Sequence, residues 1–367
     1  MNAQGDRLAG LRSELTDLDR ELIGLVARRQ ELVSRIGEHK RKQGIPTRDF
    51  AREKEVLDFA GRTATDLGVS ADVATAVIQQ LVRASLTTQE RARVLEEGRG
   101  AGRRALVIGG AGRMGGWFCE FLGSQGFAVA ISDPAGPVPG YDFAEDWRTA
   151  VLNADVIVVA TPLGVAAAIL SEIADLRPAG LIFDIGSVKT PLRAGLQALV
   201  DAGCLVASIH PMFGPDTRLL SGCHVIFADV GAPKATAEAR NLFASTMAEQ
   251  VEMDIDEHDR LMAFVLGLSH ALNLAFFTAL AESGEPAASL ARLSSTTFDA
   301  QLSVAARVAE ESPALYFEIQ ALNQYGGRAL GALGSAIERI RTIVSDEDLS
   351  AFATLMENGR AYLASLT

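Results

Sequence analysis

The first 92 residues carry the apolar pattern of long helices. Leucines recur in steps of three and four between residues 8 and 25, which places them along one face of a helix. The Gly and Pro within residues 44–46 are expected to end this helix, and a second is expected to begin near Asp49. A third helical stretch runs from about Ser70 past Gln89. The segment is therefore predicted to be all-helical.

Beyond Arg104 the pattern changes to short apolar runs that alternate with helical segments. Such alternation is typical of a parallel α/β sheet. The expected strands are Ala105–Ile108, Val129–Ile131, Val156–Ala160, Leu181–Ile185 and Leu205–Ile209. From about Asp256 to the C-terminus the pattern is helical again.

These changes along the chain predict a multidomain protein. With 367 residues, each domain is large enough to bury a core of its own. The expected division is an all-α domain at 1–92, a flexible linker at 93–103, a Rossmann-type α/β domain at 104–255 and an all-α dimerisation and substrate domain at 256–367.

The formal net charge of −12 argues against nucleic acid or an anionic membrane as the main partner. This charge is uneven, because residues 1–92 hold 15 basic and 14 acidic side chains. The N-terminal segment is therefore the better host for an anionic ligand. Three scattered cysteines without metal-ligand spacing, and an N-terminus without a signal pattern, indicate a cytoplasmic protein without a metal site.

One apolar stretch, Met262–Ala281, has no charged residue and is long enough to cross a bilayer. Ser269, His270 and Asn273 lie in its middle, where polar groups would be costly in lipid. We therefore expect a helix buried at a subunit interface rather than a membrane span.

Three cations lie on or beside the apolar face of the first helix. Arg29 falls on the leucine seam, and Arg12 and Lys40 flank it. A buried cation needs an acidic partner, a path to solvent or an anionic ligand. At 1.5 Å per residue, Arg29 lies about 16 Å from Lys40 and about 25 Å from Arg12. Arg12 would therefore serve a site completed by another chain, which predicts a homodimer with interlocked helices.

The other two helices add polar groups to this picture. Asp49, Arg52 and Glu53 share one face of the second helix, and Ser85 and Gln89 continue the apolar stripe of the third. Residues 6–92 thereby resemble the all-helical chorismate mutase family. The positions that match active-site residues of that family are Arg12, Arg29, Lys40, Asp49, Arg52, Glu53, Ser85 and Gln89.

This resemblance implies the rearrangement of chorismate to prephenate. In that family the arginines hold the two carboxylates of chorismate, and a glutamate and the segment at the aspartate receive its ring hydroxyl. Lysine and glutamine donate to the ether oxygen of the breaking bond, which would make Lys40 and Gln89 the catalytic pair. A pericyclic reaction needs no nucleophile, only a compact conformer and charge placed near that oxygen.

A dinucleotide site is indicated where the first predicted strand meets the next helix. Gly110-x-Gly112-x-x-Gly115 allows a tight turn and close approach of backbone N–H groups to a pyrophosphate. The second strand ends in Asp133, which would accept the ribose 2′-hydroxyl of NAD and repel the phosphate of NADP, or would form a turn before Pro134. The candidate NAD-binding residues are Gly110, Gly112, Arg113, Met114, Gly115, Asp133, Thr161 and Pro162.

Candidate catalytic groups follow the later strands, at the edge where open α/β sheets bind ligands. Ser187 and Lys189 lie in Gly-Ser-Val-Lys, and His210 begins His-Pro-Met-Phe-Gly-Pro. A lone histidine is more often structural, but these turn residues would hold His210 at the mouth of the sheet. From Arg104 to near the C-terminus, the motifs resemble the prephenate dehydrogenase family.

That resemblance implies NAD-dependent oxidative decarboxylation of prephenate to 4-hydroxyphenylpyruvate. His210 would accept the proton of the C4 hydroxyl as hydride leaves for NAD, and Ser187 would orient this arrangement. Lys189 and His270 match positions near the substrate. Because a base must be neutral to accept a proton, activity is expected to fall in acid.

One position departs from that family. After Ser294–Phe298 the family usually carries an arginine that anchors a carboxylate of prephenate, and this chain has Asp299, which would repel one. Arg292 or Arg307 could substitute, the helix could be locally realigned, or part of the activity could be lost. A substrate with an amine, such as arogenate or 4-amino-4-deoxyprephenate, would also explain the change.

The sequence therefore predicts a bifunctional enzyme of tyrosine biosynthesis that acts on chorismate and prephenate. One alternative keeps both reactions on an amine-bearing analogue. Another is a mutase whose C-terminal part binds NAD or an aromatic amino acid as a regulatory module. Intact His210, Ser187 and glycine loop argue against this last reading.

Overall fold

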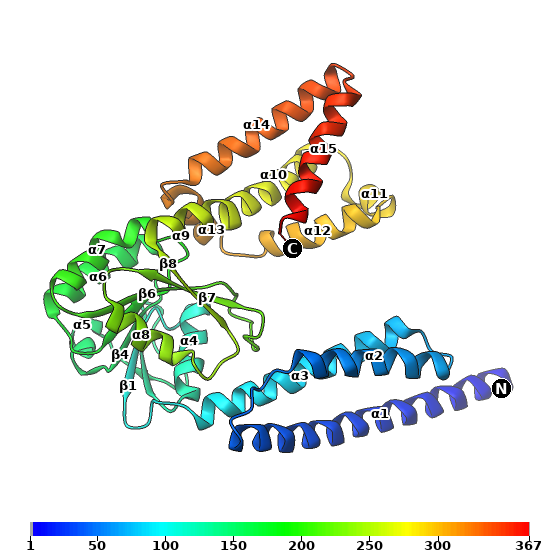
Figure 1. Ribbon diagram of the computed structural model, residues 1–367, viewed down its shortest axis with the longest axis horizontal. Helices are drawn as coiled ribbons and strands as arrows, with labels where there is room; N and C mark the ends of the chain where they lie inside the picture. The colour runs from blue at the N-terminus through cyan, green and yellow to red at the C-terminus, as the bar shows by residue number, and fades with distance from the viewer. Residues whose placement is uncertain (1–2, 367) are drawn as a thin grey trace.

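The computed structural model describes residues 3–366, in which two helical parts extend from one side of a sheet domain (Figure 1). The N-terminal part consists of α1 (Ala3–Lys42), α2 (Phe50–Asp66) and α3 (Ala71–Glu96). Helix α1 ends where Gly44 takes a positive φ of 65°, and the carboxylate of Asp49 caps α2. The prediction of an all-helical segment is confirmed.

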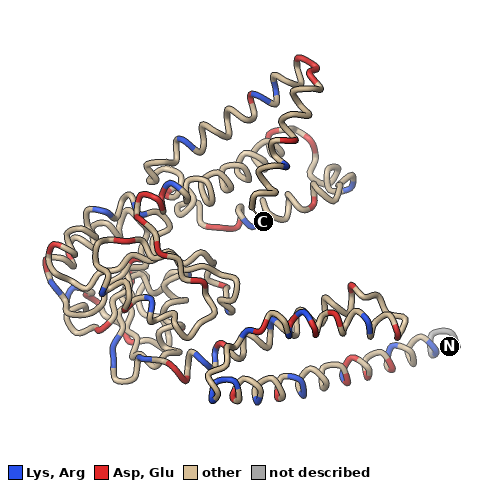
Figure 2. The backbone as a smooth tube through the Cα atoms, in the orientation of Figure 1, with Lys and Arg blue, Asp and Glu red and all other residues tan. Residues whose placement is uncertain are grey.

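The leucine seam of α1 is left largely uncovered by the part of the chain that the structure describes. Its members are between 49% and 61% exposed: Leu8, Leu11, Leu15, Leu18, Leu22 and Leu25. Side chains of both charges are spread along α1 (Figure 2). A long apolar stripe of this kind on a soluble helix marks a surface that another chain covers.

The sheet domain has eight strands in the order β3-β2-β1-β4-β5-β6-β7-β8. Their bounds are β1 Arg104–Ile108, β2 Ala128–Ser132, β3 Asp142–Phe143, β4 Val156–Val159, β5 Leu181–Asp184, β6 Leu205–Pro211, β7 His224–Asp229 and β8 Glu249–Asp254. The five expected strands are present, and β3, β7 and β8 were not foreseen. The sheet is not wholly parallel, because β7 runs antiparallel to β6.

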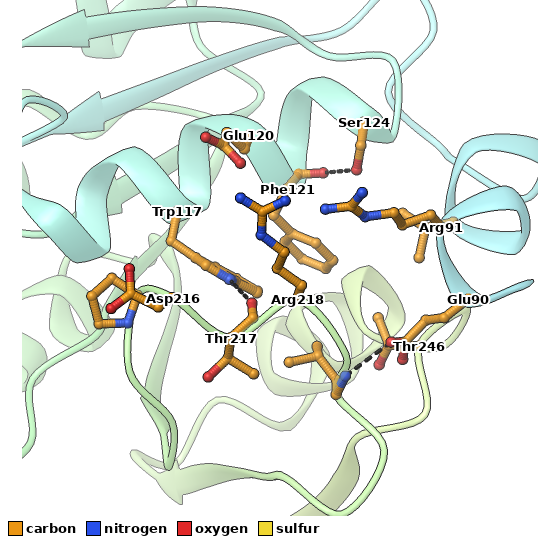
Figure 3. A pocket seen from close by; sticks show the side chains of 13 residues that line it. Glu90, Arg91, Trp117, Glu120, Phe121, Ser124, Asp216, Thr217, Arg218 and Thr246 are labelled. Atoms are coloured by element: carbon orange, nitrogen blue, oxygen red, sulfur yellow. Dashed lines mark hydrogen bonds between the residues drawn. The ribbon is translucent and has the colours of Figure 1, made fainter. Parts of the chain in front are cut away.

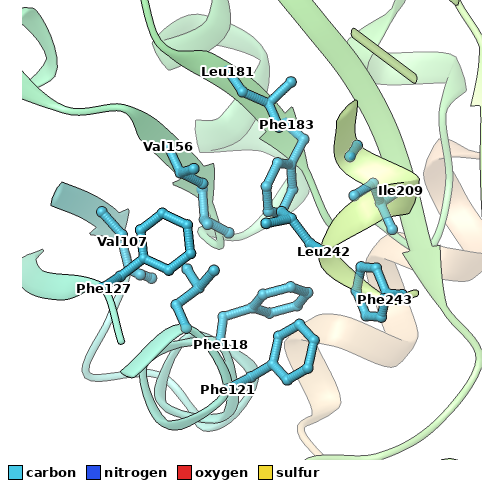
Figure 4. Close-up of a cluster of buried hydrophobic side chains, with 14 of the residues drawn as sticks. Val107, Phe118, Phe121, Phe127, Val156, Leu181, Phe183, Ile209, Leu242 and Phe243 are labelled. Atoms are coloured by element: carbon cyan, nitrogen blue, oxygen red, sulfur yellow. The ribbon is translucent and has the colours of Figure 1, made fainter. Parts of the chain in front are cut away.

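Helices on both faces of the sheet bury two apolar cores. The helices of this domain are α4 Arg113–Ser124, α5 Trp147–Ala150, η1 Val151–Asn153, α6 Leu163–Leu176, η2 Thr190–Leu192, α7 Arg193–Asp201 and α8 Pro233–Leu242. One core is rich in aromatic rings, with Phe118, Phe183 and Phe243 at its centre (Figure 4). The Rossmann-type prediction is confirmed by this architecture.

The segment expected to be a flexible linker is instead packed. Helix α3 continues to Glu96, and Val94 is buried in the aromatic core of the sheet domain. Gly100 donates its N–H to Gln125 O at 2.9 Å, and a Cβ at this glycine would lie 2.2 Å from Phe127 N. The C-terminal end of α3 is therefore packed against the sheet domain.

The C-terminal part is helical, as expected. It contains α9 Ile255–Met262, the π-helix η3 Ala263–Leu268, α10 Ser269–Glu282, α11 Ala287–Arg292, α12 Thr296–Ala309, α13 Pro313–Leu322, α14 Gly326–Ser345 and α15 Leu349–Ala364. The continuous helix Ile255–Glu282 is long and apolar enough to span a membrane, and 28% of its most apolar stretch is buried within this chain. Phe264, Val265 and Leu272 on this helix stay exposed.

Candidate functional site

A hollow of about 860 Å³ lies between α1, α2 and α3. Apolar side chains form much of its wall, and seven of the eight predicted mutase residues line it: Arg29, Lys40, Asp49, Arg52, Glu53, Ser85 and Gln89. The three helices thus bring together residues that are far apart in the sequence. The volume is that of a pocket for a small ligand.

Arg29 has no acidic partner in this hollow. Its Nη1 donates to Ser85 Oγ at 2.6 Å and to Leu81 O at 3.0 Å. Among residues 3–366, no carboxylate lies within ion-pair distance of Arg29, although burial lowers the pKa of its guanidinium. An arginine stays protonated in proteins, so this cation calls for an anionic ligand.

Lys40 and Gln89 both retain bonding capacity. Lys40 Nζ donates to Thr47 O at 3.0 Å, which leaves two of its N–H groups for a ligand. Gln89 is only 9% exposed, and its Oε1 is buried without a hydrogen-bond partner in the described part of the chain. A buried amide end of this kind indicates a group that a ligand completes.

The acidic side of the hollow is fixed by a residue that sequence reasoning missed. Arg48 donates two hydrogen bonds to the carboxylate of Glu53, from Nε at 3.0 Å and from Nη2 at 3.2 Å. Its Nη1 also donates to Ser221. Arg52 reaches Glu55 at 2.9 Å, on the exposed side of α2. No periodic signal marked Arg48, because its second partner is 173 residues away.

Arg12 does not join the hollow. It lies on the exposed N-terminal half of α1, and its side chain has no hydrogen-bond or ion-pair partner within residues 3–366. This placement is what a contribution to a second chain's site requires, and the role of Arg12 stays a prediction.

The glycine loop after β1 needs its glycines for packing. A Cβ at Gly115 would lie 2.0 Å from Gly109 O, and one at Gly110 would lie 2.5 Å from Ile131 Cγ2. Gly112 is the N-cap of α4, so the backbone N–H groups of the first turn of this helix are open to an anion.

Two further groups fit a bound NAD. Asp133 accepts from Ala111 N at 3.1 Å and from Ala135 N at 2.9 Å, so its carboxylate stands directly beside the glycine loop. Thr161 Oγ1, at the end of β4, is buried without a partner in the described chain. NAD is the cofactor that these residues would hold, and it would accept the hydride in the reaction.

Arg113 and Met114, which were also predicted to bind the cofactor, have contacts of their own within the chain. Arg113 forms ion pairs of 3.0 Å with Asp216 and with Glu311, from a loop of the sheet domain and from the C-terminal helices. Met114 packs against the aromatic core. Arg113 therefore clamps the glycine loop between two segments.

Pro162 precedes α6, whose first turn is capped from another domain. The carboxylate of Glu318 in α13 accepts from Leu163 N at 3.0 Å and from Gly164 N at 3.2 Å. Glu318 was not foreseen, because nothing local in the sequence links it to α6. The contact closes the C-terminal helices over this edge of the sheet.

His210, at the end of β6, belongs to a buried chain of three polar side chains. Its Nδ1 lies 2.9 Å from Nε2 of His258, and Nδ1 of His258 lies 2.8 Å from Oδ1 of Asp259. His210 is 3% exposed, and both members of the pair from α9 are fully buried. Sequence reasoning missed His258 and Asp259.

The hydrogen bonds among His210, His258 and Asp259 determine which nitrogen of His210 carries the proton. A carboxylate only accepts, so His258 carries its proton on Nδ1 and offers Nε2 as an acceptor. His210 must then carry its proton on Nδ1, which leaves Nε2 with a free lone pair. Burial and the neighbouring His258 and Lys189 hold the pKa of His210 well below its ordinary value, so the ring is neutral.

Lys189 lies beneath the site rather than in it. Its Nζ is fully buried and donates to Asp184 Oδ1 at 2.6 Å and to Ile209 O at 2.8 Å. Burial lowers the pKa of Lys189 while Asp184 opposes that shift. The structure thus corrects the expected substrate contact to a support for the strand that carries His210. Ser187, two residues earlier, is partly accessible.

Two residues of the C-terminal helices, His270 and Asp299, were singled out from the sequence. His270 stacks on Tyr316 with ring centroids 4.1 Å apart, and its buried Nδ1 has no partner within residues 3–366. Asp299 lies in the first turn of α12, where Ser294 Oγ donates to its exposed carboxylate. A carboxylate at a helix N-terminus is also favourable for the helix itself.

Comparison with known proteins agrees with this geometry. Chorismate mutase type II matches residues 11–90. The nucleotide-binding domain of prephenate dehydrogenase matches residues 140–251, and its dimerization domain matches residues 254–358. The glycine loop lies outside these matches, so the NAD site there rests on the geometry described above.

Relatives and solved structures resemble this chain over between 71% and 86% of its length. The T-protein of Haemophilus influenzae is 30% identical over 324 residues, which cover 86% of this chain and 81% of the relative. The 4-amino-4-deoxyprephenate dehydrogenase of Streptomyces pristinaespiralis is 32% identical over 71% of this chain and 91% of its own length. A solved prephenate dehydrogenase from A. aeolicus, in complex with hydroxyphenyl propionate and NAD+, shares the fold with a TM-score of 0.60 at 17% identity, covering 72% of this chain and 98% of that one.

Fold and sites together define a fusion of two enzymes, a helical isomerase and an NAD-dependent oxidoreductase built on a Rossmann-type sheet. The chain belongs to the T-protein family, the bifunctional chorismate mutase and prephenate dehydrogenases.

Proposed function

We propose that this protein converts chorismate to prephenate in the hollow between α1, α2 and α3, and then oxidises prephenate to 4-hydroxyphenylpyruvate in tyrosine biosynthesis. The observation that carries the proposal is the convergence of seven matching mutase residues on one cavity, in a chain whose sheet domain buries a neutral, oriented His210. Both reactions take place in one polypeptide, which is cytoplasmic in our proposal.

In the mutase, Arg29 binds one carboxylate of chorismate, with its guanidinium oriented by Ser85. Lys40 and Gln89 donate to the ether oxygen, where negative charge develops as the bond breaks. Glu53, held by Arg48, receives the ring hydroxyl, and Asp49 and Arg52 complete the same wall.

The second carboxylate of chorismate is bound by Arg12 from another chain. Arg12 stands on the half of α1 whose leucines are exposed, so covering that seam with a second copy would also deliver the arginine. Residues 254–358 match a dimerization domain and leave Phe264, Val265 and Leu272 exposed, which would form a second apolar surface for pairing. The protein is therefore a homodimer in this proposal.

In the dehydrogenase, Nε2 of His210 accepts the proton of the C4 hydroxyl of prephenate while the C4 hydrogen leaves as hydride. The C4 carbon becomes a ketone and the ring carboxylate leaves as carbon dioxide. Its electron pair makes the ring aromatic and moves to the C4 oxygen, which takes the proton back from His210 to form the phenol. Ser187 orients the hydroxyl toward His210, and His270 contacts the substrate from α10. NAD supplies the acceptor for the hydride when bound at the glycine loop.

Separate site variants test this division. Arg29→Ala is expected to abolish loss of chorismate while NADH formation from added prephenate continues. His210→Asn is expected to do the reverse. Equal loss of both activities in either variant would show that the two sites are not separate.

A second candidate keeps the chemistry and changes the substrate to an amine-bearing analogue. Asp299 favours it, because an exposed carboxylate replaces a carboxylate-binding arginine, and a 32% identical relative is a 4-amino-4-deoxyprephenate dehydrogenase. Glu53 and Asp49 favour chorismate itself, because they match the positions at which the mutase family receives the ring hydroxyl. The relative rates on prephenate and its amine analogues distinguish the two.

A further inference from the structure

Two adjacent residues of the sheet domain form hydrogen bonds with the mutase part of the chain. Leu220 and Ser221 lie in the loop between β6 and β7, a few residues after the motif that begins with His210. The N–H of Leu220 donates to Glu90 of α3 at 2.9 Å, and the hydroxyl of Ser221 accepts from Nη1 of Arg48, just before α2. One loop of the dehydrogenase therefore contacts two segments of the other enzyme.

The contact with α3 is buried. Glu90 is 4% exposed, and its second carboxylate oxygen accepts from Met247 N at 2.5 Å, so backbone groups of the sheet domain hold both oxygens. Figure 3 shows Glu90 pointing from α3 toward the sheet domain. Displacing this carboxylate is costly, because two buried hydrogen bonds would be lost. Gln89, the preceding residue, lines the mutase hollow, so the loop holds the helix that presents it.

Arg48 stands behind the acidic wall of the mutase hollow. Its side chain does not line the hollow, whereas Glu53, to which it donates two hydrogen bonds, does. The side chains of Arg48 and Glu53 are 31% and 21% exposed, so their ion pair is partly shielded from water. Arg48 therefore acts on a ligand in this hollow through Glu53.

The bond to Ser221 ties this ion pair to the sheet domain. Arg48 and Glu53 are five residues apart on one segment, so their two hydrogen bonds hold the side chains to each other. Phe50, whose ring centroid lies 4.2 Å from Arg48 Cζ, belongs to the same segment. A guanidinium presents its N–H donors in one fixed plane, so anchoring Nη1 orients the donors that face Glu53. Without Ser221 the two side chains would be free to rotate together.

We propose that Ser221 of the dehydrogenase domain is a positioning residue for the mutase reaction, acting through Arg48 to hold Glu53 where it receives the ring hydroxyl of chorismate. The inference rests on the proposed function, which assigns that hydroxyl to Glu53. The mutase site is then completed by the loop that follows the catalytic histidine of the other enzyme. Glu90 holds α3 to the same loop, so the two anchors keep α2 and α3 in a fixed relation.

Removing the hydroxyl of Ser221 tests this role. Ser221→Ala deletes the acceptor of Arg48 Nη1 at a partly exposed position, so the protein should fold. The mutase kcat/KM for chorismate is expected to fall about 3–10-fold, the range for one partly exposed hydrogen bond. Most of the loss should be a higher KM, because the ring hydroxyl is bound both before and during the rearrangement. Ser221→Thr, which keeps a hydroxyl, is expected to retain most of the activity.

Two controls accompany this variant. NADH formation from added prephenate is expected to stay at the wild-type rate. Thr217→Val is the matched control, because it removes from the same loop a hydroxyl that has no hydrogen-bond partner within residues 3–366. This variant is expected to keep the wild-type mutase kcat/KM. A loss equal to that of Ser221→Ala would show that any change in the loop disturbs the mutase, which would overturn the specific role of Ser221.

A double-mutant cycle shows whether Ser221 acts through Glu53. Glu53→Ala is expected to lower the mutase kcat/KM by itself, and adding Ser221→Ala is expected to cause no further loss. An unchanged kcat/KM in Ser221→Ala alone, or the same loss in both backgrounds, would overturn the positioning role. If instead the wild-type protein does not consume chorismate, or Glu53→Ala leaves the rate unchanged, the proposed function of the mutase site is contradicted.

Discussion

At the residue scale, the dehydrogenase depends on the state of one imidazole. Burial keeps His210 neutral, and the chain through His258 to Asp259 determines which nitrogen carries the proton. The carboxylate of Asp259 can serve this purpose because hydrogen bonds from His258, Thr190 and Lys189 N lower its pKa, although burial opposes the shift. His210 can thus act as a general base, because its Nε2 keeps a free lone pair.

Replacing His258 with leucine tests its role as a positioning residue. Leucine keeps the site apolar and of similar size but removes the acceptor for His210 Nδ1–H, so the ring loses its fixed orientation and tautomer. The dehydrogenase kcat is expected to fall by about 10²–10⁴-fold, with a smaller change in KM for prephenate. The mutase rate serves as the internal control, and unchanged kcat would exclude this role.

The pH dependence follows from the direction of the His210 shift. A base acts only above its pKa, and that of His210 lies well below the ordinary value near 6.5. The dehydrogenase is therefore expected to retain its kcat as the pH falls through 6.5 and to lose it only in stronger acid. A kcat profile against pH with its midpoint at or above 6.5 would show that His210 is not shielded as described.

Only those site residues that lie in local sequence motifs could be predicted from the sequence. His210 stood out because its neighbours are turn residues after a strand, and the glycines stood out by their spacing. His258, Arg48 and Glu318 act through partners 48, 173 and 154 or more residues away, and no pattern in the sequence marks such pairs. Lys189 was found by its motif, but its burial depends on the packing of β5 against β6.

At the element scale, each long helix serves two purposes. Helix α3 presents Ser85 and Gln89 to the mutase hollow, while Glu90 binds backbone N–H groups of the sheet domain. Helix α1 presents Arg29 and Lys40 at its C-terminal half and an exposed leucine seam at its other half. Periodicity predicted these helices well, because an apolar seam persists whether the chain itself or a partner covers it.

Placing lysine on that seam tests the proposed pairing. Leu15 and Leu22 are more than half exposed in the single chain, so the Leu15→Lys and Leu22→Lys double variant should fold. It is expected to lose mutase activity, because α1 of one chain can no longer bring Arg12 to the other, while NADH formation from prephenate persists. Glu21→Lys, a charge change on the same helix, is the control. Full mutase activity in the double variant would contradict the mixed-chain site.

At the scale of the whole molecule, the features that could not be predicted from the sequence are those that depend on packing between distant segments. The three regions were visible in the change of periodicity, but the glycines of residues 98–102 suggested flexibility where Gly100 packs closely on Phe127. Strands β7 and β8 were missed because the chain reverses after the His210 motif, and β8 carries charged residues on an exposed edge. These departures together create the junction between the two enzymes.

The proposed dehydrogenase function requires that prephenate is the compound oxidised by this chain. The most direct test is NADH formation by the purified protein with NAD and, in turn, prephenate, arogenate and 4-amino-4-deoxyprephenate. Prephenate is expected to be turned over fastest, which would make Asp299 a local variation at the start of α12. Preference for an amine-bearing substrate would contradict that claim and identify Asp299 as the specificity residue, and no NADH with any of the three would contradict dehydrogenase function altogether.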